Sequence, residues 1–191
     1  MGRWEPNAQG RLEEAAMELF SDRGYEQTTV AEIAARAGLT ERTFFRHYAD
    51  KREVLFGGSA HFRENFIGAL AGAPASLTAV EAVAAAVEAA SAALDEFRGR
   101  EFARARQRLI VANPELRERE LIKLADVTVG MAEALRARGV EEPEASMTAE
   151  LGMASFRVAF ERWLAAGEER KLRELITEAL ASVAATLQPG G

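Results

Sequence analysis

The stretch Thr28-Thr-Val-Ala-Glu-Ile-Ala-Ala-Arg-Ala-Gly-Leu-Thr-Glu-Arg-Thr-Phe-Phe-Arg-His-Tyr-Ala-Asp-Lys51 decides how the fold is interpreted. Counted from Val30, Ala34 is the fifth residue, Gly38 the ninth and Phe44 the fifteenth. In a helix-turn-helix the fifth position is small because the second helix crosses there, and the ninth accepts the backbone of a tight turn. The spacing therefore predicts a helix-turn-helix, with an αα-hairpin of a plain helical bundle as the alternative.

Basic side chains gather in the same segment. Residues 36–52 hold five basic and two acidic residues, whereas the whole chain has a net charge of −6. Side chains near the start of the second short helix are expected to reach base edges, and polar groups beside it to reach phosphates. A plain hairpin does not need this charge pattern. The residues predicted to contact DNA are Thr29, Thr40, Arg42, Thr43, Arg46, His47, Tyr48 and Lys51.

Over about residues 9–56 the chain resembles the TetR family of one-component bacterial transcription regulators. The resemblance implies a homodimer whose larger C-terminal helical domain binds a small molecule that releases the DNA. It also implies a repressor that leaves a palindromic operator. The positions that usually touch DNA in this family are matched by Thr29, Thr43, Tyr48 and Lys51.

The chain departs from the family pattern at two positions. Arg42 stands where a glycine is common and Phe45 where a tyrosine is common, so the operator sequence does not transfer. The segments Glu41–Arg46 and Ala112–Arg119 resemble a branch of the family that includes mycofactocin-associated regulators. That weaker resemblance implies a ligand similar to an acyl-CoA.

The rest of the chain is expected to be helical, because apolar residues recur at three and four positions and strand alternation is almost absent. The fold class is all-α, with a three-helix DNA-binding domain followed by a helical bundle for ligand binding and dimerisation. The expected domains are a flexible arm at 1–8, the helix-turn-helix domain at 9–56 and the bundle at 57–191. Helices are expected at about 9–23, two within 30–48, 51–71, 78–98, 101–112, 115–138, 144–166 and 168–187.

The pair Gly57-Gly58 lies inside the expected helix 51–71. Two glycines in a helix cost roughly 2 kcal/mol relative to alanine. They therefore indicate either a soft point between the domains or a close packing contact that only glycine permits.

An effector site is expected in the C-terminal bundle. Arg106 falls on the apolar stripe of its helix, where it would meet a ligand carboxylate or phosphate, or instead pair with a glutamate of a neighbouring helix. The expected ligand is long and apolar with an anionic end, a fatty acid or acyl thioester, with a hydrophobic drug-like compound as second choice. The lining residues are Phe97, Phe102, Arg106, Leu109, Met131, Phe156 and Phe160, although such side chains are also typical of plain core.

A dimer interface is expected on the last two helices. Helix 144–166 carries two apolar stripes, and one face cannot bury both. Burial within one chain is the alternative to a twofold four-helix contact. The interface residues expected are Leu151, Val158, Leu172, Ile176 and Val183.

Other functions have weaker support. The chain has no cysteine and two histidines, so we expect no metal site, no cofactor and no catalytic residues, in a protein of the reducing cytoplasm. Neither a signal peptide nor a membrane span is expected. The alternatives to a DNA-binding regulator are a helical interaction adaptor and a small acid/base enzyme.

Overall fold

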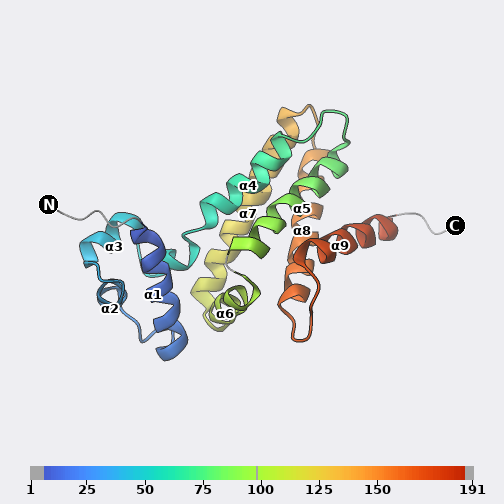
Figure 1. Cartoon of the computed structure of the whole chain (residues 1–191). Coiled ribbons are helices and arrows are strands. Elements are labelled where there is room, and N and C mark those ends of the chain that lie inside the picture. Colours follow the sequence, from blue (N-terminus) through green and yellow to red (C-terminus); the bar gives the residue numbers. More distant parts are fainter. Residues whose placement is uncertain (1–6, 98, 188–191) are drawn as a thin grey trace. The chain divides into compact units, whose positions relative to one another are not determined.

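The computed structural model describes residues 7–97 and 99–187, and within these ranges it contains helices and no strand. The all-α expectation is confirmed for this part of the chain (Figure 1). No helix in it is long and apolar enough to cross a membrane. The elements are α1 (Ala8–Arg23), α2 (Val30–Arg36), α3 (Glu41–His47), the 3-10 helix η1 (Glu53–Phe56), α4 (Ser59–Ala71), α5 (Ala79–Phe97), α6 (Gly99–Ala112), α7 (Pro114–Ala137), α8 (Glu144–Leu164) and α9 (Leu172–Leu187).

The contacts divide the chain into two compact units. The first unit runs to Ser59 and also contains Arg104–Leu121; the second contains Ala60–Ala103 and the chain from Ile122 onward. This division differs from the boundary expected at residue 57. The end of α6 and the start of α7, expected in the bundle, pack instead with the N-terminal helices.

The expected continuous helix 51–71 is wrong. A 3-10 turn ends at Phe56, and α4 begins only at Ser59. Gly57 has a helical backbone with φ −55°, so its glycine is not required by the backbone conformation. It is required by space, because a Cβ at Gly57 would collide with the Glu13 carboxylate and lie 2.6 Å from the Tyr48 hydroxyl.

The core of the first unit is built from the apolar stripe of α1. Leu12 and Phe20 are buried there together with Ile33 of α2 and Phe44 of α3. Gly38, with φ +67°, makes the turn between α2 and α3, a conformation that glycine adopts without a Cβ penalty. These contacts fix the two short helices of the expected helix-turn-helix.

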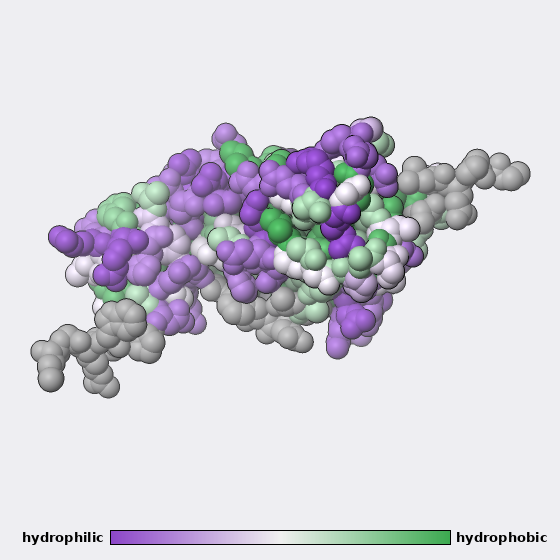
Figure 2. All heavy atoms as spheres, turned by 90° about the horizontal axis from the view of Figure 1, so that it is seen from above, coloured by the Kyte–Doolittle hydropathy of each residue, from purple (hydrophilic) through white to green (hydrophobic). Residues whose placement is uncertain are grey.

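The second unit has a core in which α5, α8 and α9 pack against one another (Figure 1). Val83 and Val87 of α5 are buried there with Phe156 of α8. A Cβ on Gly152 would meet the side chain of Val83, so the glycine allows α5 and α8 to approach closely. On the face shown in Figure 2, hydrophobic residues are scattered among hydrophilic ones.

Candidate nucleic-acid interface

The start of α3 is held by a side-chain cap. The Thr40 hydroxyl accepts a 3.2 Å hydrogen bond from the backbone N–H of Thr43, and the two hydroxyls lie 3.0 Å apart. Arg42 and Arg46 are exposed four residues apart, a spacing that places both on one face of the helix. The structure therefore brings four of the predicted DNA-binding residues together on one short helix, with His47 exposed at its end.

Basic residues around α3 are partly neutralised. Arg36 forms an ion pair with Glu18 at 2.7 Å, and Arg52 one with Asp50 at 2.6 Å. The side chain of Arg52 donates to Asp50 and, despite partial desolvation, holds the pKa of that carboxyl below its ordinary value. By contrast, Arg42 and Arg46 form no ion pair within residues 7–97 and 99–187. Within the helix-turn-helix segment, the exposed arginines that keep their charge free of an ion pair thus lie on α3.

Thr29 lies at the start of α2 in a reciprocal cap. Its hydroxyl accepts from the Glu32 N–H at 3.2 Å, and the Glu32 carboxylate accepts from the Thr29 N–H at 2.9 Å. Hydrogen bonds from the backbone and then the side chain of Thr29 lower the pKa of Glu32. The residue is exposed, and its hydroxyl serves the helix terminus in this structure.

Tyr48 is placed differently from the expectation that its hydroxyl reaches a phosphate. The side chain is buried, and its hydroxyl donates to the Glu13 carboxylate at 2.8 Å. The ring packs against Phe44 with centroids 5.5 Å apart. Because α3 ends at Tyr48 in extended backbone, the side chain turns back toward α1 and ties the two helices together.

Lys51 is half-buried and contacts Tyr25, which follows α1. Its ammonium donates to the carbonyl of Tyr25 at 2.8 Å and lies 4.1 Å from the centroid of the Tyr25 ring. Burial, and then the nearby Glu115 carboxylate, raises the pKa of Tyr25, so the ring stays neutral under the ammonium. An ammonium has three donors, and this contact positions Lys51 by using one of them.

Arg106, expected at a ligand, belongs to the first unit. Its Nε donates to the Leu55 carbonyl at 3.0 Å, its guanidinium pairs with Glu120 at 2.8 Å, and it lies over the Phe56 ring at 5.0 Å. The expected ligand role is therefore corrected in favour of the glutamate pair on a neighbouring helix. A desolvated arginine needs such a partner, and Glu120 supplies it.

The other expected lining residues divide between the units. Leu109 lies in the first unit, and the second holds half-buried Phe102 and buried Met131. Phe156 and Phe160, also in the second unit, stack with centroids 5.6 Å apart. The side chain of Phe97 lies outside the described residues. The expected set therefore does not gather in one unit.

The expected dimer residues also divide. Leu172 and Ile176 have no exposed surface and pack inside the second unit, so their assignment to an interface is wrong. Val158 is 53% exposed, while Leu151 and Val183 are half-buried. The apolar stripe of α8 that contains Val158 thus remains partly at the surface, as expected for a helix with two apolar stripes of which one face can bury only one.

Two family models match the chain, one in its N-terminal part and one in its C-terminal part. The family model of bacterial regulatory proteins of the tetR family matches residues 12–56, and the MftR C-terminal domain model matches residues 77–188. These matches cover a helix-turn-helix head and most of the following bundle. The chain belongs to the TetR family of bacterial regulatory proteins and carries an MftR-type C-terminal domain.

Among its relatives is the HTH-type transcriptional regulator TcmR of Streptomyces glaucescens, 42% identical over 74 residues, 39% of this chain and 33% of TcmR. A second is MftR of Mycobacterium tuberculosis, named for mycofactocin biosynthesis, 30% identical over 61% of this chain and 58% of MftR. The alignments thus span less than two thirds of either relative. The solved Thermus thermophilus FadR, a TetR family repressor in complex with lauroyl-CoA, is 26% identical over 96% of this chain and all of FadR, with a TM-score of 0.57.

Proposed function

We propose that the protein is a ligand-responsive transcriptional regulator of the cytoplasm, a homodimeric repressor that leaves a palindromic operator when an apolar or acyl-type molecule binds its second unit. The observation that carries the proposal is the pair of uncompensated arginines on capped α3, Arg42 and Arg46, in a chain of net charge −6. Within the helix-turn-helix segment, attraction to DNA is then concentrated on α3, and the acidic net charge of the chain disfavours other orientations.

A dimer is part of the proposal for a geometric reason. One short recognition helix reaches only a few base pairs, whereas a twofold pair places two such helices in successive major grooves, about 34 Å apart. The exposed Met147 and Val158 give α8 apolar surface that a second copy would cover.

The small-molecule part of the proposal is supported by the MftR-type domain and by the similarity to FadR, which was solved with lauroyl-CoA. Its structural support in this chain is the aromatic content of the second unit, where Phe156 and Phe160 stack. An adaptor or an enzyme has no comparable support, because the family is one of regulatory proteins.

The test is a mobility shift with DNA from upstream of the gene for this chain. We expect the parent protein to bind one palindromic site, and the Arg42→Ala/Arg46→Ala variant to lose at least tenfold in affinity, since each bidentate base contact is worth about 1–3 kcal/mol. The matched control is Arg108→Ala/Arg117→Ala, which removes two exposed arginines from α6 and α7. Equal losses in both variants, or no binding by the parent, overturn the proposal.

A further inference from the structure

A row of aromatic rings runs through the second unit. Phe62 and Phe66 of α4 lie 4.7 Å apart, and Phe66 meets Phe156 of α8 edge-on at 5.5 Å. Phe156 stacks on Phe160 at 5.6 Å, and Phe160 contacts Trp163 at 5.7 Å. Phe62 and Phe160 are half-buried, so the row has members that reach the surface. The row therefore runs from the partly exposed Phe62 and Phe160 into the apolar core of the second unit.

The row ends at the indole nitrogen of Trp163, which donates no hydrogen bond within the described residues. Trp163 is 1% exposed, and its indole N–H has no hydrogen-bond partner within the described part of the chain. A buried donor without an acceptor costs free energy, and folded proteins rarely keep one. An unused donor of this kind calls for a specific explanation.

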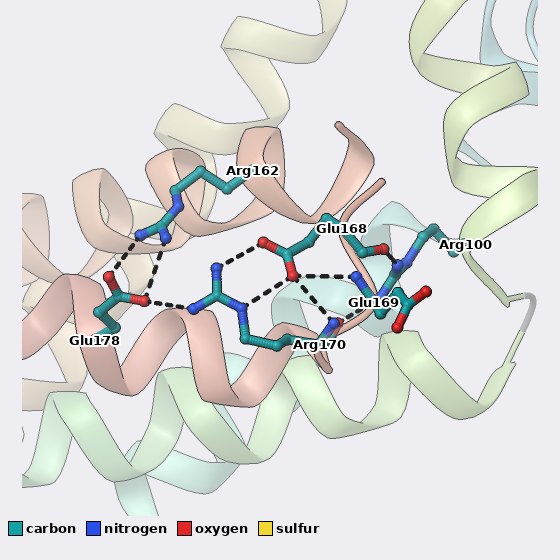
Figure 3. A network of polar contacts seen from close by, with 6 residues as sticks. All are labelled: Arg100, Arg162, Glu168, Glu169, Arg170 and Glu178. Atoms are coloured by element: carbon teal, nitrogen blue, oxygen red, sulfur yellow. Dashed lines mark hydrogen bonds and ion pairs between the residues drawn. The ribbon is translucent and has the colours of Figure 1, made fainter. Parts of the chain in front are cut away.

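The Arg100 guanidinium beside Trp163 cannot accept this hydrogen, because a guanidinium only donates. Arg100, whose guanidinium lies 5.3 Å from the indole ring, donates to the backbone carbonyls of Glu168 and Arg170 (Figure 3). Arg170 in turn donates to the Glu168 carboxylate at 2.7 Å and to Glu178 at 2.9 Å. These polar contacts of the α8–α9 connection thus run among Arg100, Glu168, Arg170 and Glu178, and none of them uses the indole N–H.

We infer that the indole N–H of Trp163 binds a neutral hydrogen-bond acceptor, the carbonyl of an acyl chain, on an effector that lies along the aromatic row. This inference rests on the proposed function and names the chemistry of its effector. One indole hydrogen bond cannot offset the cost of desolvating a carboxylate, and the Arg100 guanidinium beside the ring already donates to two backbone carbonyls, so the group that Trp163 binds is neutral. Arg106, expected to receive an anionic end, is occupied by Glu120.

The sharpest probe is a pair of ligands that differ only in the carbonyl. Lauroyl-CoA carries a thioester carbonyl, and S-dodecyl-CoA is the thioether with the same chain length and headgroup. We expect the parent to bind lauroyl-CoA about 3- to 10-fold more tightly, the usual range for one hydrogen bond. Replacing Trp163 by benzothienylalanine exchanges the N–H for sulfur in a ring of nearly the same size, and the preference should fall to about one.

A second measurement needs no change at residue 163. The chain has two tryptophans, so a Trp4→Phe variant labelled with nitrogen-15 tryptophan gives a single indole signal. Lauroyl-CoA should move its proton downfield, as a new hydrogen bond does, and S-dodecyl-CoA should not. This readout stays decisive if the benzothienylalanine variant folds poorly.

Two results overturn the inference: equal affinity of the parent for both ligands, or binding of neither. In both cases operator binding measured without ligand decides the proposed function separately. A parent that binds its operator but does not distinguish the ligands remains a DNA-binding regulator with a different effector contact.

Discussion

The Tyr48 hydroxyl donates a 2.8 Å hydrogen bond to the carboxylate of Glu13, thirty-five residues earlier in the chain. Both side chains are buried, so the bond joins the end of α3 to α1 inside the first unit. Gly57 lies against both polar groups, where a Cβ has no room. The recognition helix is thus fixed at its start by the Thr40 cap and at its end by this bond.

The two glycines after η1 should respond differently to alanine. Gly57→Ala must displace Glu13 and Tyr48, and overpacking of this kind costs about 1–3 kcal/mol, whereas Gly58 has no neighbouring atom within 4 Å of an added Cβ. We expect a lower Tm for Gly57→Ala and an unchanged or slightly higher one for Gly58→Ala. If Gly58→Ala keeps operator binding but loses effector response, the soft-point interpretation holds for that position. A Gly57→Ala variant as stable as the parent contradicts the packing argument.

Tyr48→Phe should act on stability rather than on DNA. The change removes one hydrogen bond of the buried Glu13, at a cost of about 1–3 kcal/mol. Urea unfolding of the variant measures that cost, and a mobility shift under folding conditions should give nearly the parent affinity. Normal stability with weakened operator binding would instead show that the hydroxyl reaches a phosphate.

Arg42→Ala should reduce operator affinity by about 1–3 kcal/mol and relax the preference at one base pair of each half-site, because a guanidinium specifies guanine through two hydrogen bonds. Binding to a library randomised at single operator positions measures both effects. Arg36→Ala is the control from the same unit, since that arginine is paired with Glu18. A uniform loss at every position would assign Arg42 to a phosphate.

The α8–α9 connection should weaken at acidic pH. Hydrogen bonds from the Arg170 side chain lower the pKa of Glu168 from its ordinary value of 4.5 to about 2. The stabilising contribution is therefore complete above about pH 4.5 and lost as the pH falls toward 2. The Tm difference between the parent and Glu168→Gln should narrow over that interval, with Glu169→Gln as the charge-matched control. A difference that is constant with pH contradicts this assignment.

Val158→Glu should separate the dimer without unfolding the chain. Val158 is 53% exposed in one chain, so a carboxylate there costs little until a second copy covers it. Sedimentation should show that the variant is a monomer. The variant should keep the helicity of the parent and lose operator binding. Ile176→Glu should unfold the second unit instead, since that side chain is buried within one chain. A dimeric Val158→Glu protein would place the interface elsewhere.

Local patterns predicted the fold well. Gly38, the ninth position of the helix-turn-helix spacing, has the positive φ that the expected tight turn needs. The helix-turn-helix could be found because its spacing lies within twenty residues. The turn at Gly57 could not be predicted, because the groups that crowd this glycine come from α1 and from the end of α3.

The site residues were harder to predict, because their roles also depend on partners from distant parts of the chain. A stripe on α6 correctly indicated that Arg106 points inward, but its partner Glu120 follows a turn whose geometry the sequence does not give. Burial of Leu172 and Ile176 depends on which face of α9 meets α5 and α8. The unused donor of Trp163 can be recognised only once every neighbouring acceptor has been placed.

The inclusion of Arg104–Leu121 in the first unit has a consequence for synthesis of the protein on the ribosome. Glu53 and the Leu55 carbonyl emerge before their partners Arg119 and Arg106 have been translated. At ~5–20 residues per second, the interval between residues 59 and 121 is roughly 3–12 s. During that time the nascent segment from α1 to η1 lacks the contacts of Arg106 and Arg119. The first unit can therefore form all of its contacts only after residues 60–103 of the second unit have also been synthesised.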